Sequence, residues 1–149
     1  MNSGGYGKST GRPQGQQQVS ITVPDFNDAE ALGKKAEDLS RTLADHTGLT
    51  THQLRRFYNE VKNIERILDA SQDKVLAWKT AFPRIKLLKA KAVYNASRKQ
   101  NRLPSQFCDF ISKCVERIPA EKENGMKAFD SFCQLFEAVV GYSSAYTRD

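Results

Sequence analysis

The apolar positions of this chain recur at helical spacing from about residue 28 nearly to its end. In a helix, side chains three and four positions apart share one face, so this spacing predicts a series of amphipathic helices. The first is expected from about Asp28 to Ala44, with Asn27 or Asp28 as its N-cap and Gly48 just beyond its end. Its apolar face consists of Leu32, Ala36, Leu39 and Leu43.

Two further helices are expected in the middle of the chain. Thr50 or Thr51 caps a helix that reaches about Ala70, with an apolar stripe of Leu54, Phe57, Tyr58, Val61, Ile64 and Leu68. The next begins near Ser71 or Asp73 and carries Val75, Trp78 and Phe82. Pro83 either kinks it or begins a new helix, because proline lacks a backbone donor and crowds the preceding turn. The continuation, from Arg84 to about Gln100, carries Ile85, Leu88, Ala92 and Val93.

Prolines also delimit the last two helices. Pro104 ends the preceding element, and a helix from Ser105 to Ile118 stops before Pro119. Its stripe is Phe107, Phe110, Ile111, Cys114, Val115 and Ile118. The last helix, capped by Asn124, ends near Gly141 and presents Met126, Phe129, Cys133, Phe136 and Val140. The fold class is therefore all-α, a compact bundle of about five helices.

The first 24 residues differ in composition from the rest. They contain five of the nine glycines, four glutamines and two prolines, and too few aliphatic residues to offset chain entropy by burial. We expect residues 1–24 to be a flexible Gly/Gln-rich tail and residues 25–149 to form the helical domain. The alternation of Val19, Ile21 and Val23 is typical of a strand, but without a second candidate strand it indicates an extended linker or a docking segment.

Length and composition exclude several classes of protein. With 149 residues the chain is about one domain long, which excludes a large multidomain enzyme. No stretch approaches the roughly 18 to 20 apolar residues of a membrane span, so we expect no membrane association. The three cysteines are an odd number and no secretory signal precedes them, which favours a reduced, cytoplasmic protein.

Positive charge is concentrated in the middle of the chain. The sequence has 23 Lys and Arg against 17 Asp and Glu, a net charge of +6. Residues 49–103 hold thirteen bases and four acids, whereas residues 25–48 and 104–149 have net charges of −3 and −2. From Lys74 to Cys108 there are nine bases and no acid. Opposite charges one turn apart normally stabilise a solvated helix, so their absence here favours an anionic partner.

The basic residues form stripes on two of the expected helices. Positions i, i+4, i+7 and i+11 beside the apolar face of the second helix are Arg55, Asn59, Lys62 and Arg66. The comparable stripe after Pro83 consists of Arg84, Lys91, Arg98 and Arg102. Arginine and lysine displace counterions from phosphates, so two adjacent helices of this kind predict a surface for a nucleic-acid backbone, read without sequence specificity. The alternative is that these charges only solubilise the surface.

Short motifs that could indicate catalysis, a cofactor or a metal lack the flanking residues or the spacing that such sites require. Gly7-Lys8-Ser9-Thr10 resembles the end of a P-loop, but its first glycine would fall at Asn2 and no strand precedes it. The spacings of His46 and His52 and of the three cysteines match no zinc signature. We therefore expect no catalytic residue, no cofactor and no metal site.

The aromatic residues and cysteines are assigned to the core. Phe107, Phe110, Phe129, Phe132 and Phe136 recur at helical spacing, and Cys108, Cys114 and Cys133 are interpreted as small core residues. The core is also the default interpretation for Tyr58, Trp78, Tyr94 and Tyr142, although such rings can offer a polar edge.

Two stretches carry a family resemblance. Residues 49–61, LTTHQLRRFYNEV, and residues 88–98, LKAKAVYNASR, resemble the small subunit of type III-A CRISPR effector (Csm) complexes. The first stretch resembles a capped helix that opens with threonines, glutamine, leucine and a basic pair. The second resembles a leucine and lysine that lead to a tyrosine, with a basic residue one turn later. The resemblance spans about Leu49 to Tyr142 and includes a final helix that ends in a tyrosine.

The resemblance implies a helical, non-catalytic RNA-binding subunit of a ribonucleoprotein for antiviral defence. Its expected partners are the guide RNA and target RNA, other copies of itself, the backbone subunits and the large polymerase-like subunit. In that family the backbone subunits cut the target and the small subunit positions the strand. The residues that the resemblance places at RNA phosphates are Arg55, Arg56, Lys62, Lys91 and Arg98.

Two other functions fit the same residues. A helix-turn-helix DNA-binding protein is one, because Asp45 to Thr51 is a short turn and the next helix begins with Gln53, Arg55 and Arg56. A helical adaptor that binds no nucleic acid is the other, with the apolar seam from Met126 to Val140 as its binding surface.

Overall fold

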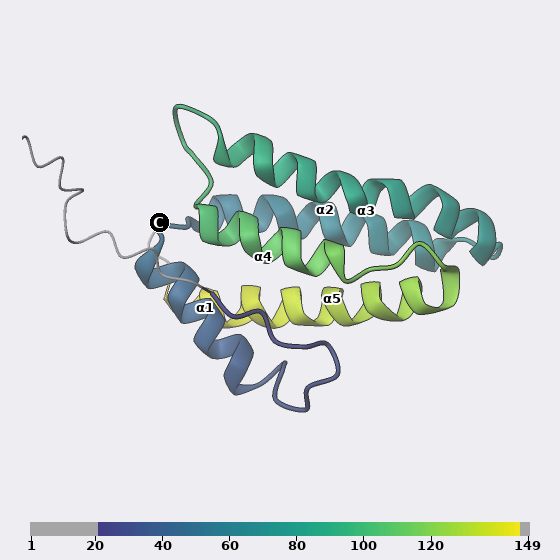
Figure 1. The fold of residues 1–149 in the computed structure, drawn as a ribbon, viewed down its shortest axis with the longest axis horizontal. Helices are drawn as coiled ribbons and strands as arrows, with labels where there is room; N and C mark the ends of the chain where they lie inside the picture. The colour runs from purple at the N-terminus through teal and green to yellow at the C-terminus, as the bar shows by residue number, and fades with distance from the viewer. Residues whose placement is uncertain (1–20, 147–149) are drawn as a thin grey trace, which may run out of the picture.

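A computed structural model describes residues 21–146, and within that range every regular element is an α-helix. The helices are α1 (Lys34–His46), α2 (Thr51–Ala70), α3 (Lys74–Ala96), α4 (Ser105–Glu116) and α5 (Lys122–Ser143). Four of them, α2 to α5, follow the long axis of the molecule, and α1 crosses obliquely near one end (Figure 1). The all-α bundle of five helices predicted from the sequence is confirmed.

The helices that contact most of the others are α3 and α5. α3 contacts α2, α4 and α5, and α5 contacts α1, α2 and α3. α2 and α3 are joined by only three residues, so they lie antiparallel, with the start of α2 beside the end of α3. The loop from Ser97 to Pro104 joins α3 to α4 and protrudes beside that end (Figure 1).

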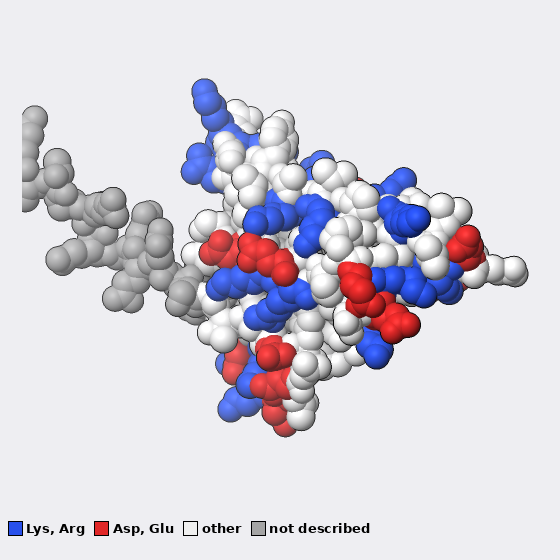
Figure 2. Space-filling view, turned by 45° about the vertical axis from the view of Figure 1, so that its right-hand side comes forward, with Lys and Arg blue, Asp and Glu red and all other residues white. Residues whose placement is uncertain are grey.

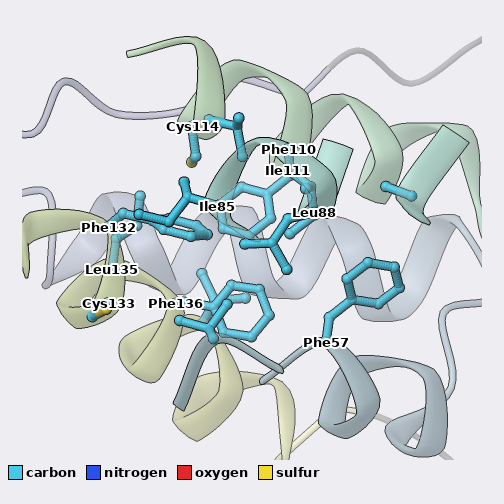
Figure 3. Close-up of a cluster of buried hydrophobic side chains, with 14 of the residues drawn as sticks. Phe57, Ile85, Leu88, Phe110, Ile111, Cys114, Phe132, Cys133, Leu135 and Phe136 are labelled. Atoms are coloured by element: carbon cyan, nitrogen blue, oxygen red, sulfur yellow. The ribbon is translucent and has the colours of Figure 1, made fainter. Parts of the chain in front are cut away.

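The core is a cluster of phenylalanine rings between α2, α4 and α5. Phe110 and Phe136 stack with their centroids 5.7 Å apart, and Phe132 and Phe136 meet edge to face at 5.8 Å. Ile85 and Leu88 of α3 are fully buried beside them (Figure 3). The five phenylalanines expected in the core are all buried, which confirms that interpretation.

The cysteines also belong to the core region, as predicted. Cys114 and Cys133 are buried and Cys108 is half-buried, and all three are free thiols. Burial raises the pKa of Cys114 to about 12 and raises the pKa of Cys108 and Cys133 as well. The three side chains are therefore protonated at neutral pH and are poor nucleophiles.

The first helix begins later than predicted, at Lys34 instead of Asp28. The Asp28 carboxylate accepts a hydrogen bond from the backbone N–H of Glu30 (2.8 Å) and pairs with Lys35, which stabilises a local turn instead of a helix. Gly33 precedes the helix with non-helical angles. Leu32, expected on the apolar face, is consequently exposed, whereas Ala36, Leu39 and Leu43 are buried as predicted.

Pro83 does not begin a new helix, so of the two alternatives only a kink within one helix stays open. It lies inside α3, which runs unbroken from Lys74 to Ala96 and stops short of the predicted end at Gln100. Asp73 caps its start by accepting from the Leu76 N–H at 3.1 Å. Val75 and Val93, expected on the apolar face, are about half exposed, because α3 is covered on one side only.

The cap of the last helix is Glu121 and not Asn124. The Glu121 carboxylate accepts from the backbone N–H groups of Glu123 (3.1 Å) and Asn124 (2.9 Å), so α5 begins one turn earlier than predicted. The helix also extends two residues beyond the predicted end at Gly141.

The end of the segment predicted as a tail packs against the bundle. Residues 1–20 lie outside the described residues, but Ile21 and Val23 are buried. Arg117 donates to the carbonyl oxygens of Pro24 (2.6 Å) and Val23 (3.1 Å) and lies 5.4 Å from the Phe26 ring centroid. For residues 21–24, these contacts agree with the docking alternative.

A close approach between α3 and α5 generates a stability prediction. A Cβ at Gly125 would meet the Trp78 ring and lie 2.5 Å from the Pro119 carbonyl oxygen, whereas a Cβ at Gly141 would have nothing within 4 Å. Trp78 cannot easily move, because its indole N–H donates to the Ala120 carbonyl at 2.7 Å. Gly125→Ala should therefore lower the free energy of unfolding by about 1–3 kcal/mol.

Gly141→Ala is the matched control in the same helix. It should raise the free energy of unfolding by about 0.5–1 kcal/mol, because alanine is the better helix former. Urea unfolding of both variants measures the difference. Equal effects of the two substitutions would contradict the close approach at Gly125.

Candidate nucleic-acid interface

The start of α2 is fixed by a reciprocal cap. Thr50 accepts from the Gln53 backbone N–H through its side-chain oxygen at 3.1 Å, and the Gln53 side-chain oxygen accepts from the Thr50 N–H, also at 3.1 Å. This capping box satisfies two donors that the first turn of a helix leaves unpaired. The predicted cap at Thr50 or Thr51 is confirmed as Thr50.

The same glutamine holds the loop between α3 and α4. Its side-chain NH₂ group donates to the carbonyl oxygens of Asn101 and Arg102, both at 3.3 Å. The loop is further tied to α3 by the Leu103 N–H, which donates to the Asn95 carbonyl at 3.0 Å. Asn101 has a φ of +51°, the left-handed region that asparagine tolerates better than most residues. The loop is thereby fixed against the start of α2.

A concave surface lies between these elements, and we call it the α2–α3 groove. Its larger part has a volume of about 650 Å³ and is lined by the first two turns of α2, the end of α3 and the loop. A smaller part of about 370 Å³ continues along α3 and is lined by Arg56, Phe57, Glu60, Lys91, Tyr94, Asn95 and Arg98. The lining side chains come from opposite ends of two consecutive helices, the start of α2 and the end of α3, and from the loop that follows α3.

Four of the predicted RNA-binding residues converge on this groove. Arg55 and Arg56 come from α2, Lys91 from α3, and Arg98 from the first residues of the loop. Within residues 21–146, no carboxylate lies within ion-pair distance of Arg55, Arg56 or Arg98. Figure 2 shows basic side chains without acidic neighbours at the tip of the protrusion, and mixed charges lower on the same face.

Arg102 is a fifth predicted residue close to the groove. It lies in the loop and its guanidinium Nε donates to the Arg98 carbonyl at 2.9 Å. Its side chain is exposed, so its remaining donors face solvent. Of the two stripes, Arg55, Lys91, Arg98 and Arg102 lie in or beside the groove. Arg56 belongs to neither stripe and is predicted from the family resemblance.

The other three predicted residues lie elsewhere. Lys62 is half-buried, pairs with Glu65 at 3.1 Å and lies 5.5 Å from the Tyr58 ring centroid, and the hydrogen bond to Glu65 raises the pKa of Lys62. Arg66 donates to the Asn63 side chain at 3.1 Å. Arg84 is exposed near the middle of α3. The i+7 and i+11 positions of the α2 stripe therefore lie too far along that helix to line the groove.

Several bases of the acid-free segment stabilise the fold. Lys86 donates to the carbonyl oxygens of Val115 and Ile118 at the end of α4, both at 3.2 Å. Lys74 donates to the Leu68 carbonyl at 2.6 Å near the end of α2. These ammonium groups bind carbonyl oxygens at or just beyond the C-termini of α2 and α4, where a positive charge is favourable. The excess of bases in the sequence therefore overstates the charge available to a ligand.

One carboxylate does enter the groove. Glu60 pairs with Lys91 at 3.1 Å across α2 and α3, and both side chains are nearly half exposed. An exposed pair of this kind contributes about 0–1 kcal/mol to stability, so a competing phosphate could displace Glu60 from Lys91. Lys91 is the least available of the four groove bases.

Tyr94 lines the groove and does not lie in the core, where the sequence predicts it. Of its side chain 70% is exposed, because it lies on the side of α3 that no other helix covers. Tyr58 and Tyr142 are half-buried against the core and Trp78 is buried, as predicted. Helical spacing could have predicted this exposure. Ile85, Leu88 and Ala92 lie on the buried face of α3, and Leu76, Leu87 and Tyr94 lie on the opposite face.

The geometry suits binding of an anionic polymer. Among residues 21–146, no group of three or more His, Cys, Asp or Glu side chains is arranged to hold a metal ion. No described helix is long and apolar enough to cross a membrane. α1 packs on α5 instead of across α2, unlike the paired helices of a helix-turn-helix unit, so the start of α2 is bordered by α3 and its loop.

Comparisons with known proteins identify the family. No curated protein and no solved structure matches the chain. A family model described as Csm2 Type III-A matches residues 27–149, which include every helix of the bundle and the whole groove. The chain therefore belongs to the Csm2 family, the small subunit of type III-A CRISPR-Cas Csm complexes.

Proposed function

We propose that this protein is a non-catalytic RNA-binding subunit that holds RNA by its sugar-phosphate backbone within the Csm complex. The observation that carries the proposal is the α2–α3 groove, where Arg55, Arg56 and Arg98 converge with no carboxylate in ion-pair distance among the described residues. Guanidinium forks bind phosphate oxygens in a planar, two-pronged geometry that lysine cannot reproduce.

Binding of this kind is independent of sequence. Each phosphate neutralised by a base releases condensed counterions, so affinity falls steeply with salt. The groove is formed by helix sides and a loop and inserts no helix into a duplex groove, so it positions a strand without reading base edges. The cutting of target RNA belongs, by the family resemblance, to the backbone subunits, and this chain positions the strand for them.

The proposed partners follow from membership of the complex. They are the guide RNA and target RNA, the backbone subunits, the large polymerase-like subunit and other copies of this chain, in a cytoplasmic antiviral defence system. The bases proposed to contact RNA are Arg55, Arg56, Lys91, Arg98 and Arg102 in and beside the groove. Lys62, Arg66 and Arg84 are proposed to contact only RNA that extends beyond it.

Exposed apolar side chains on α3 support the contact with another copy. Leu76 and Leu87 are 60% and 53% exposed and lie eleven residues apart, three helical turns, on one face. Lys79 and Arg84 border that face, whereas residues 25–48 have a net charge of −3 and expose Leu32. We propose that the α3 face of one copy packs on the acidic α1 region of the next, which gives an open, head-to-tail stack.

The groove generates the central test. Replacing Arg55, Arg56 and Arg98 by alanine should weaken binding of single-stranded RNA by the full chain for every sequence tested. The plot of log affinity against log salt should also become shallower, its negative slope decreasing in magnitude by about 2, since each lost phosphate contact removes about 0.7. Fluorescence anisotropy over a salt series measures both quantities, and circular dichroism checks that the helices remain.

Two controls make that test specific. Lys62→Ala with Arg66→Ala removes bases of the same helix outside the groove and should reduce the salt slope less than the groove variant does. Glu60→Gln releases Lys91 from its ion pair and should tighten binding instead. The groove assignment is rejected if the two multiple variants lose affinity and slope equally.

The proposed stack has its own test. Leu76→Asp together with Leu87→Asp should dissociate higher assemblies of the purified chain, because two carboxylates would replace apolar contact and meet an acidic surface. Sedimentation velocity measures the distribution of sizes. Lys113→Glu, which changes the charge by the same two units on exposed α4, is the control and should leave the distribution unchanged. Stacking that survives the double substitution would rule out this face.

A further inference from the structure

Tyr94 lies on the uncovered side of α3, and its ring has no partner among the described residues. With 70% of its side chain accessible, it is the most exposed large hydrophobic residue of the described chain. Tyr58 stacks on Phe136, Tyr142 donates its hydroxyl to the Leu32 carbonyl, and Tyr146 accepts from Arg41. Among residues 21–146, Tyr94 is the one tyrosine without a ring contact or a hydroxyl hydrogen bond. Its ring is therefore available to a ligand.

The surroundings of Tyr94 are cationic and not apolar. The ring shares the smaller part of the α2–α3 groove with Arg56, Lys91 and Arg98. Lys91 lies three residues before it on α3, and Arg98 lies four residues after it, just beyond the end of the helix at Ala96. Both line the same part of the groove as the ring, one on either side of it along the chain. A planar aromatic surface between two cations matches one nucleotide, which has a flat base and a phosphate on each side.

We propose that Tyr94 is a stacking platform for an unpaired RNA base, with Lys91 and Arg98 at the phosphates that flank that nucleotide. The inference rests on the proposed RNA-backbone function and adds the form of the ligand, a strand with at least one base out of the helical stack. Bases inside a duplex have their faces covered by their neighbours, so a ring can stack only on a base that is unpaired, splayed out or terminal. Stacking uses the face common to all bases, so the site remains independent of sequence.

A protein partner is the competing occupant of this ring. Tyr94 continues the stripe of Leu76 and Leu87, but those two residues lie outside the groove. An apolar partner seated on Tyr94 would also cover Arg56 and Arg98, which have no carboxylate to pair with, and burying an unpaired charge is costly. A nucleotide supplies both an apolar face and the neutralising phosphates.

The test compares two probes that carry the same number of phosphates. One is an oligoadenylate RNA of about ten nucleotides, and the other is an abasic strand of equal length. Tyr94→Ala in the full chain should weaken binding of the RNA about tenfold, the effect of losing one stacked base, and should change binding of the abasic strand less than twofold. Tyr94→Phe should retain affinity, and Tyr94→Leu should not. Val75→Ala, an exposed apolar residue of the same helix outside the groove, is the control and should bind both probes as the wild type does.

A spectroscopic measurement separates stacking from a merely structural role. Tyr94→Trp adds an exposed indole to a chain whose one tryptophan, Trp78, is buried. Its fluorescence should be quenched by the RNA and not by the abasic strand. Equal quenching by both probes, or an equal loss of both in Tyr94→Ala, would overturn the inference and leave the backbone function standing.

Two other outcomes also decide the matter. If Tyr94→Ala alters the sedimentation of the chain and not its RNA affinity, the ring is a protein contact and the inference is wrong. If the wild-type chain binds neither probe at low salt, the proposed backbone function fails first and the inference fails with it.

Discussion

The side-chain amide of Gln53 joins the two halves of the candidate interface. Its oxygen accepts a hydrogen bond from the Thr50 N–H at the N-cap of α2. Its NH₂ group donates to two carbonyl oxygens of the loop between α3 and α4. One planar group therefore fixes both the helix that carries Arg55 and Arg56 and the loop that begins with Ser97 and Arg98. A phosphate site requires several donors at fixed separations. The spacing between the arginines of α2 and the arginine of the loop therefore depends on this link.

The basic residues of the chain divide into those that hold the fold and those that face solvent. Lys86 caps the end of α4, Lys89 pairs with Glu116 at 2.7 Å, and Lys62 is held by Glu65. The groove arginines have no such partner among the described residues. The ammonium groups of Lys74 and Lys86 bind carbonyl oxygens. The planar forks of Arg55, Arg56 and Arg98 lie in the groove, where their geometry suits an anion. The bases between Lys74 and Cys108 thus have two roles: some stabilise the fold, and only the others are available to a ligand.

The sequence predicts the fold well where one periodic pattern dominates. The stripes from Leu54 to Leu68 and from Phe107 to Ile118 lie in the core as expected, because each helix has one apolar face and one neighbour to cover it. The prediction fails where local chemistry competes with the pattern. At Asp28 a side chain captures a backbone N–H and delays the helix. At Pro83 the pattern leaves a kink or a new helix open, and α3 continues as one helix in which Ala81 and Ile85, on either side of the proline, are both buried.

The site was predictable only in part, for a related reason. Helical spacing correctly groups Arg55 with α2 and Arg98 with the end of α3, but it cannot show that Lys62 turns toward Tyr58 or that Tyr94 is left uncovered, because both depend on which neighbours each helix has. α3 carries apolar side chains on two sides, and only tertiary packing decides which side is buried.

The floor of the groove is continuous with the core. Phe57 lines both parts of the groove, yet it is only 4% exposed, and its ring meets Phe107 edge to face with the centroids 5.4 Å apart. Phe107 in turn contacts Phe110 and Phe136. Because interiors are close-packed, a change in this ring cluster must shift Phe57 or open a void, and either response moves the helix turn that presents Arg55 and Arg56. The candidate interface and the core are therefore one mechanical unit, and a substitution deep in the bundle can alter the proposed RNA binding without touching a basic residue.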